Sequence, residues 1–167
     1  MSDSKSRLVL AAALAAAAAL SGCATVAEGR PAPAVRGDAW LPSATKGDDL
    51  LAGKWGLVVV LRADSEACAE EIPAVLALRK EFGPKGLAVV GVTASDGEAA
   101  AAFAKDHGLD FPVLTDAEKV VDAWGIPEVN RLHTYLVDPP GVVVVQGDLA
   151  KTREVLGRYL VPAAKPR

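Results

Sequence analysis

The sequence predicts an α/β domain with a central mixed sheet flanked by helices. Continuous runs of aliphatic, mostly β-branched residues, as expected for strands buried on both faces, alternate with segments of helical apolar periodicity. Near the C-terminal end, two short apolar runs flank Asp138-Pro139-Pro140-Gly141, a pattern typical of a β-hairpin. A parallel β-α-β crossover followed by a hairpin gives a sheet that contains both parallel and antiparallel pairs.

The elements follow in order along the chain. The first strand is expected at residues 57–61 (LVVVL), where every residue is aliphatic. The first helix is expected at residues 66–82, because its apolar residues recur at helical spacing, basic residues lie near its end and a Gly-Pro pair follows. The other expected strands are residues 87–92, 111–114, 134–137 and 142–145. The other expected helices are residues 98–107, 118–124 and 150–160.

Composition and charge narrow the possible functions. The chain has 167 residues, of which 51% are hydrophobic and 23% are charged, which is a globular composition. A net charge of −3 does not favour a nucleic-acid partner, because such a partner requires a basic face. Only 2 Cys and 2 His occur, without CxxC or HExxH spacing, so we expect neither a metal site nor a cofactor.

The N-terminal residues resemble the signal of a bacterial lipoprotein. Lys5 and Arg7 precede an uncharged apolar run, residues 8–20, whose length suits a signal-peptide core of roughly 7–15 residues and not a membrane span of about 20. Leu20-Ser21-Gly22-Cys23 then resembles the lipobox, in which the cysteine receives a diacylglyceryl group and becomes the new N-terminus. The resemblance implies lipidation of Cys23 and a membrane anchor in the bacterial cell envelope, facing the periplasm or the cell exterior. An ordinary cleaved signal peptide and a packed alanine-rich helix are the alternatives.

These features divide the chain into four parts. We expect a lipoprotein signal peptide at residues 1–23 and a flexible linker, rich in Pro and Gly, at residues 24–37. One domain is expected at residues 38–162, followed by a short tail at residues 163–167. Several acyl chains on one cysteine would hold the protein on the membrane lastingly, which a single chain does not.

Five short segments of the expected domain occur in an order and at a spacing known from one protein family. They are Gly53-Lys54-Trp55, CAEEIP at residues 68–73, KGLAVVGV at residues 85–92, HGLDFPVLTD at residues 107–116 and VDAWGI at residues 121–126. Together they resemble the AhpC/TSA-type redoxins of the thioredoxin-like superfamily, a group that includes peroxiredoxins and membrane-tethered thioredoxin-like proteins. The resemblance implies a thioredoxin-like fold.

The chain departs from this family at the active-site positions. Disulfide-exchanging members have CxxC, and their first cysteine falls on Ser65, so a dithiol cycle lacks its second sulfur. Leu132 occupies the position of the cis-proline that thioredoxins place before the hairpin strand. Peroxiredoxins have P-x-x-x-[TS]-x-x-C, which Ser65 and Cys68 match but Leu61, at the proline position, does not. Their arginine resembles Arg131, which lies one residue away in a gapless alignment.

The resemblance to peroxiredoxins assigns Cys68 the role of a peroxidatic thiol. Such a cysteine attacks a peroxide oxygen as the thiolate and becomes a sulfenic acid. A position in the first turn of a helix favours the thiolate, and Arg62 and Arg131 add positive charge. Nearby carboxylates oppose a second negative charge unless they point away. They are Asp64, Glu66, Glu70 and Glu71.

We therefore expect an antioxidant oxidoreductase of one-Cys peroxiredoxin type, in which Cys68 reduces peroxide and an external thiol or thiol protein restores the cysteine. Ser65 and Arg131 would orient the peroxide. Each of these residues also has a purely structural interpretation: Cys68 as a buried apolar side chain, Ser65 as a helix N-cap and Arg131 as a solvated loop residue. The alternative function is a non-catalytic binding or scaffold module, and a disulfide oxidoreductase with a relocated partner thiol is a more distant one.

Overall fold

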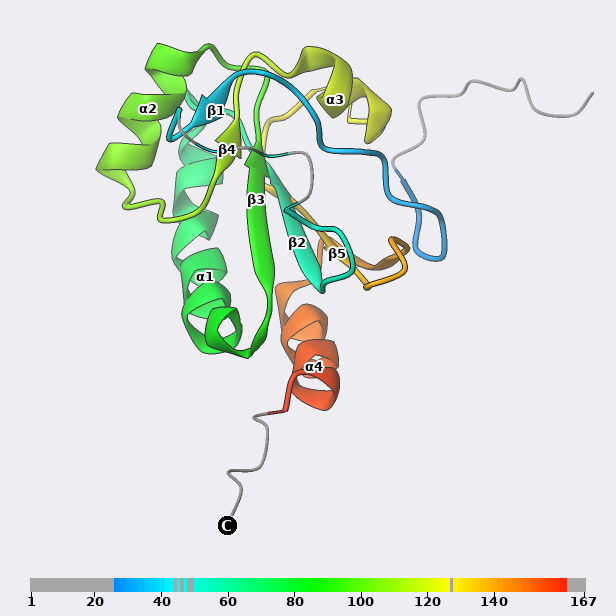
Figure 1. The fold of residues 1–167 in the computed structure, drawn as a ribbon. Coiled ribbons are helices and arrows are strands. Elements are labelled where there is room, and N and C mark those ends of the chain that lie inside the picture. Colours follow the sequence, from blue (N-terminus) through cyan, green and yellow to red (C-terminus); the bar gives the residue numbers. More distant parts are fainter. Residues whose placement is uncertain (1–25, 44, 46, 48–49, 127, 162–167) are drawn as a thin grey trace, which may run out of the picture.

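A six-stranded mixed sheet forms the centre of the computed structural model, which describes residues 26–43, 45, 47, 50–126 and 128–161 (Figure 1). The strand order is β1-β4-β3-β2-β5-β6. The strands are β1 Trp40–Leu41, β2 Gly56–Val60, β3 Ala88–Val92, β4 Val113–Leu114, β5 His133–Val137 and β6 Val143–Gln146. The helices are α1 Glu66–Phe82, α2 Gly97–Asp106, α3 Glu118–Ala123 and α4 Leu149–Tyr159, with a 3-10 helix at Gly83–Lys85.

The strand pairing confirms the predicted α/β class with a mixed sheet. Strand β2 pairs in parallel with β3 and antiparallel with β5, and β5 and β6 form an antiparallel hairpin. Helix α1 connects β2 to β3, and α2 leads from β3 to β4, the next strand outward. Because such crossovers are right-handed, both helices lie on the same face of the sheet.

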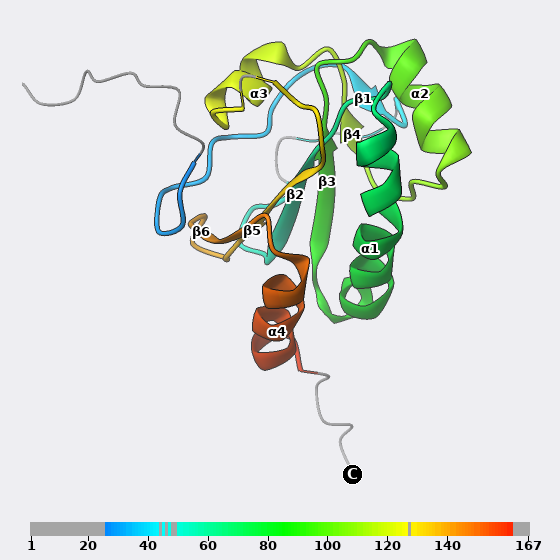
Figure 2. The ribbon, with the colours of Figure 1, turned by 180° about the vertical axis from the view of Figure 1, so that it is seen from behind.

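Both faces of the sheet are covered, which explains why all five residues of β2 are buried. Helix α4 packs beside α1 on one face, where an ion pair of 2.5 Å joins Arg153 to Glu81. On the other face, the ring of Trp124, which follows α3, packs against Tyr135 of β5 with ring centres 4.7 Å apart. Figure 2 shows α1 and α3 on opposite sides of the strands. Strand β5 therefore presents alternate side chains to two different layers.

The predicted helices and strands are confirmed, with ends at or within two residues of the predicted ones. Helix α1 has the predicted bounds at both ends. Strand β1 was not predicted, because two residues are too short to display a periodicity. It pairs antiparallel with β4, with Trp40 opposite Leu114, and closes the outer edge of the sheet.

Residues 26–35 lie along the outer edge of β6. The amide of Gly29 donates to the carbonyl of Val143 at 2.7 Å, and the amide of Val143 donates to the carbonyl of Arg30 at 2.9 Å. Pro31 continues this edge as an isolated bridge, and the side chain of Val35 is buried. The described part of the expected linker at residues 24–37 thus contacts the domain and extends its sheet.

Three of the predicted features lie outside the described residues. They are the signal peptide at residues 1–23, its lipobox Cys23 and the tail at residues 163–167. Within the described part of the chain, no helix is both long enough and apolar enough to cross a membrane.

Candidate functional site

Ser65 organises the start of helix α1. It has an extended backbone at the N-cap position, and its Oγ accepts a hydrogen bond from the amide of Cys68 at 3.3 Å. Serine is favoured at this position because a short side-chain oxygen satisfies an amide that has no partner inside the helix. Cys68 thus lies in the first turn of α1, where the helix dipole favours negative charge. The structure therefore brings Ser65 and Cys68 together, as the S-x-x-C spacing predicts.

The same hydroxyl joins α1 to the loop before β5. Ser65 Oγ donates to the backbone carbonyl of Asn130 at 3.2 Å, an interaction that we call the loop contact. His133, the first residue of β5, lies opposite Val60, the last residue of β2, so this loop crosses the end of the sheet from which α1 begins. Leu132, at the position where thioredoxins have proline, is buried. The loop contact therefore ties Asn130 to the start of α1.

Cys68 is completely buried, with an exposed fraction of 0%. It is a free thiol and belongs to the same apolar core as Ile72 and Val75. A reagent in solvent therefore reaches this sulfur only after a local opening of the domain.

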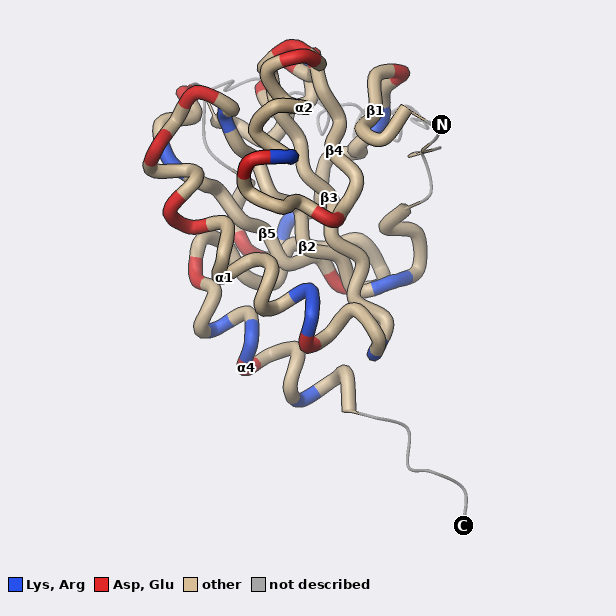
Figure 3. The backbone as a smooth tube through the Cα atoms, turned by 90° about the vertical axis from the view of Figure 1, so that its left-hand side faces the viewer, with Lys and Arg blue, Asp and Glu red and all other residues tan. Residues whose placement is uncertain are grey.

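The charges near Cys68 are partly neutralised among themselves. Arg62 Nε and Nη2 donate to the two carboxylate oxygens of Asp64 at 2.5 and 3.1 Å. This hydrogen bonding raises the pKa of Arg62 and lowers the pKa of Asp64. Acidic residues colour the N-terminal half of α1 in Figure 3, where Glu66 and Glu70 are exposed. Water screens these carboxylates, so they oppose a thiolate less than their number suggests.

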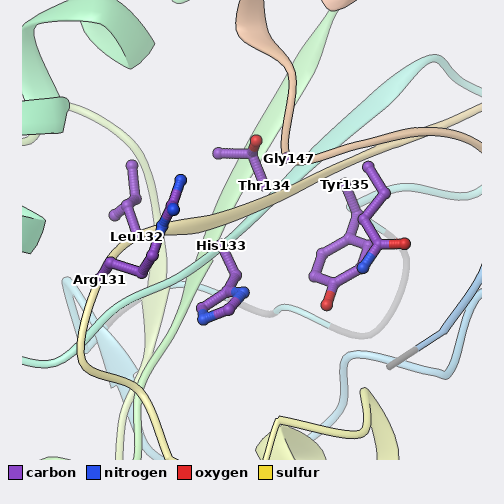
Figure 4. Close-up of a pocket in the computed structure, with 7 residues that line it drawn as sticks. Arg131, Leu132, His133, Thr134, Tyr135 and Gly147 are labelled. Atoms are coloured by element: carbon purple, nitrogen blue, oxygen red, sulfur yellow. The ribbon is translucent and has the colours of Figure 1, made fainter. Parts of the chain in front are cut away.

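Arg131 directly follows Asn130, the residue of the loop contact. Its side chain is exposed and forms no hydrogen bond or ion pair with another described residue. It lies instead at a pocket of about 280 Å³ beside β5, shown in Figure 4. The pocket is lined by Arg131, Leu132, His133, Thr134, Tyr135, Gln146 and Gly147. The structure therefore places the predicted arginine next to the loop contact but shows no interaction of its guanidinium with the thiol.

The pocket contains polar groups that the sequence did not reveal. His133 Nε2 and the hydroxyl of Tyr135 are buried and have no hydrogen-bond partner among the described residues. Burial lowers the pKa of His133, and the positive charge of Arg131 lowers it further, while the negative charge of Glu71 raises it. Burial raises the pKa of Tyr135 to about 12. Sequence reasoning missed this pocket because Tyr135 occupies a strand position that predicts only a core residue.

The two histidines differ in their surroundings. His107 ends α2, is exposed, and lies with its ring 4.5 Å from that of Phe103. His133 is partly buried and lines the pocket beside β5. Among the described residues, no group of three or more His, Cys, Asp and Glu side chains is arranged to hold a metal ion.

Comparison with protein families decides what kind of domain this is. A model of the AhpC/TSA family matches residues 29–146. The chain belongs to the AhpC/TSA family. The match begins at Gly29, inside the segment that extends the sheet along β6, which indicates that this segment is part of the AhpC/TSA domain.

The relatives of this AhpC/TSA chain include a thiol-disulfide oxidoreductase and a peroxiredoxin. The chain is 29% identical over 97 residues to the thiol-disulfide oxidoreductase ResA of Bacillus subtilis, which covers 57% of this chain and 53% of ResA. It is 33% identical over 98 residues to the chloroplastic peroxiredoxin Q of Sedum lineare, covering 54% of this chain and 53% of that protein. The chain thus spans about half the length of these relatives.

Solved structures confirm the thioredoxin-like fold. The thioredoxin domain of a thiol-disulfide oxidoreductase from Bacteroides vulgatus superposes with a TM-score of 0.69 at 25% identity, covering 79% of this chain and 99% of that domain. AhpC of Mycobacterium tuberculosis superposes with a TM-score of 0.61 at 21% identity, covering 84% of this chain and 97% of that one. This AhpC/TSA domain therefore has the fold of the family while its active-site positions differ from CxxC.

Proposed function

We propose that this redoxin domain is a thiol peroxidase of one-Cys type, with Cys68 as the nucleophile. The observation that carries the proposal is the hydrogen bond from the amide of Cys68 to Ser65 Oγ in the first turn of α1. The first turn of a helix is a position where the helix dipole favours negative charge, and the thiolate is the form of cysteine that attacks peroxide. The match to AhpC/TSA and the relationship to peroxiredoxin Q support the same chemistry.

The reaction needs one thiol in the protein and two from outside. The thiolate of Cys68 attacks one oxygen of a hydroperoxide, an S–O bond forms as the O–O bond breaks, and the other oxygen leaves as an alcohol or water after taking a proton. Cys68 is then a sulfenic acid. A first external thiol forms a mixed disulfide with it and releases water. A second external thiol reduces this disulfide and restores Cys68, which leaves the external disulfide as product.

The buried sulfur gives the catalytic cycle an opening step. Peroxide reaches Cys68 after the loop contact breaks and residues 130–132 move off the start of α1, and the larger external thiol requires the same opening. Arg131, on this loop, would return with it and place its guanidinium toward the peroxide oxygens. Thiol proteins are the natural reducing partners of such a cycle, as the relationship to thiol-disulfide oxidoreductases supports.

A non-catalytic binding module is the second candidate function. Two observations favour it. Cys68 is completely buried, as is typical of a residue that only packs in the core, and a polar pocket lies beside β5. In that case Cys68 would be replaceable by alanine with a loss of stability alone.

We further propose that Cys23 carries lipid and anchors the domain to a membrane of the cell envelope. The support is the Leu20-Ser21-Gly22-Cys23 sequence at the end of a signal-like segment. Only two residues separate Cys23 from Val26, whose amide bonds the carbonyl of Trp124 at 3.2 Å. A lipid on Cys23 would therefore hold the domain close to the membrane surface.

Peroxide consumption by matched variants tests the enzymatic proposal. With dithiothreitol as the reductant, the wild-type chain should consume hydrogen peroxide or cumene hydroperoxide catalytically, and Cys68→Ser should not. Arg131→Ala should slow the reaction, while Arg36→Ala, another exposed arginine, should leave it unchanged. Equal rates for the wild type and Cys68→Ser would contradict the proposal and favour the binding module.

A further inference from the structure

The connection between β2 and α1 sets the position of the thiol site. It consists of residues 61–65, which we call the thiol loop. At one end of this loop, the amide of Leu61 donates to the carbonyl of Val92 in β3 at 3.0 Å, which continues the sheet. At the other end, Ser65 caps α1 and forms the loop contact. The place of Cys68 in the first turn of α1 therefore depends on how the thiol loop is held between these ends.

Ser95 holds the middle of the thiol loop from outside. The amide of Ala63 donates to Ser95 Oγ at 3.1 Å, a contact between residues that lie 32 apart in the sequence. Ser95 belongs to the connection from β3 to α2, and Figure 1 shows that α1 and α2 begin at the same end of the sheet. Within the described part of the chain, no other side chain from outside the thiol loop forms a hydrogen bond with its backbone.

Ser95 is itself fixed by the ends of two further strands. Its amide donates to Oγ1 of Thr93, a completely buried residue directly after β3, at 3.1 Å. Its carbonyl accepts from the amide of Asp116, just after β4, at 3.0 Å. Asp116 has a φ of 53°, which residues other than glycine seldom adopt, and this hydrogen bond helps to hold it there. The Ser95 hydroxyl is therefore presented to Ala63 from a backbone that is bonded on both sides.

The part of the thiol loop that Ser95 holds carries a positive charge close to the thiol. Ala63 lies between Arg62 and Asp64, whose side chains form the ion pair described above, so fixing Ala63 fixes the backbone of both. The hydrogen bond and the charge of Asp64 raise the pKa of Arg62 most, and a negative charge on Cys68 raises it further. Because the attraction between two charges is mutual, the guanidinium of Arg62 also stabilises negative charge at the sulfur.

We propose that Ser95 is a positioning residue of the thiol site, whose hydroxyl holds Ala63 so that Arg62 stays beside Cys68 while peroxide reacts. This inference rests on the proposed peroxidase function. The opening that admits peroxide breaks the loop contact at one end of the thiol loop, whereas Ser95 keeps the middle of the loop attached to the rest of the domain. A guanidinium near the sulfur is also near the attacking peroxide, where it stabilises the negative charge that moves onto the departing oxygen.

Two rates measured on the native full chain test this role. Hydrogen peroxide oxidises Cys68 and iodoacetamide alkylates it, and both reactions need the same opening and the same thiolate. The ratio of the peroxide rate to the alkylation rate therefore cancels access and ionisation, and it reports the stabilisation of the departing oxygen. Ser95→Ala should lower this ratio about 2- to 10-fold, the effect expected from one neutral hydrogen bond.

Thr152→Val is the matched control for the loss of a hydroxyl. The Thr152 hydroxyl is buried and donates to the carbonyl of Asp148 at 2.8 Å, but it belongs to α4 and has no contact with the thiol loop. This variant should keep the wild-type ratio. Urea unfolding of both variants shows whether each is folded under the conditions of the rate measurements.

A double variant shows whether Ser95 acts through Arg62. Arg62→Ala should lower the ratio at least as much as Ser95→Ala, and Ser95→Ala should lower it no further in the Arg62→Ala background, because effects of coupled residues are not additive. The proposal is overturned if Ser95→Ala keeps the wild-type ratio, if Thr152→Val lowers it equally, or if the two substitutions are additive. These three outcomes leave the peroxidase function standing. A wild-type chain in which iodoacetamide but not peroxide reacts with Cys68 overturns both proposals.

Discussion

Replacing Ser65 by alanine should expose Cys68 without unfolding the domain. The substitution removes the N-cap hydrogen bond to the amide of Cys68, at 3.3 Å, and the loop contact to Asn130, at 3.2 Å. An N-cap contributes about 1 kcal/mol and a neutral hydrogen bond about 0.5–1.5 kcal/mol. Together they stabilise the closed state by roughly 1.5–2.5 kcal/mol, and because each 1.4 kcal/mol is tenfold, the open population should rise more than about 10-fold.

The rate at which iodoacetamide alkylates Cys68 in the native protein measures this opening, since a buried sulfur reacts only when it is exposed. Asp148→Ala is the matched control. It removes an equivalent N-cap bond, from the amide of Lys151 to Asp148 Oδ1 at 2.8 Å, but from α4. Ser65→Ala should accelerate alkylation more than about 10-fold, and Asp148→Ala should not. An equal acceleration in both variants would mean that Cys68 is exposed by global unfolding, and no acceleration in Ser65→Ala would refute the role of the loop contact.

Three further results follow from the structure. Burial lowers the pKa of His133, so the folded state favours its neutral form. The free energy of unfolding should therefore be at its full value above the unfolded pKa of about 6.5 and should fall as the pH drops through the lower folded pKa. Urea titrations at several pH values should show that His133→Gln reduces this dependence on pH. A variant that begins at residue 36 should lose about 1–3 kcal/mol of stability, because it lacks the backbone bonds of Gly29 and Arg30 to β6; unchanged stability would mean that this edge contributes nothing. Cys23→Ala should leave the membrane fraction or accumulate as precursor on fractionation of expressing cells, whereas a soluble wild-type chain with an unmodified N-terminus would contradict lipidation.

The sequence predicted those parts of the fold that side chains encode locally. Helix α1 has its predicted bounds because Ser65 caps it and a Gly-Pro pair follows Phe82. The S-x-x-C geometry was predictable for the same reason, since residues three apart at a helix start are necessarily close. Strand β1 and the edge formed by residues 26–35 were missed, because their partners are distant in sequence and their bonds are made by backbone groups.

In the candidate sites, too, the local features were predictable from the sequence and the features that depend on distant residues were not. The pairing of Ser65 with Cys68 is local, but the contact of Ser65 with Asn130 and the burial of Cys68 depend on how β5 lies beside β2. The pocket depends on the point at which β6 leaves β5, which no residue pattern marks. Tyr135 lines this pocket from a strand position that predicts only a core residue.

The most direct test of the central claim is the oxidation state of Cys68 after exposure to peroxide. The full, reduced chain is treated with a stoichiometric amount of hydrogen peroxide, trapped with a sulfenic-acid reagent and analysed by peptide mass spectrometry. The account predicts that Cys68 is converted to the trapped sulfenic acid, and that added external thiol returns it to the free thiol. A Cys68 that remains a free thiol in peroxide, while unfolded protein reacts normally with the same reagent, would contradict the claim that it is a peroxidatic cysteine.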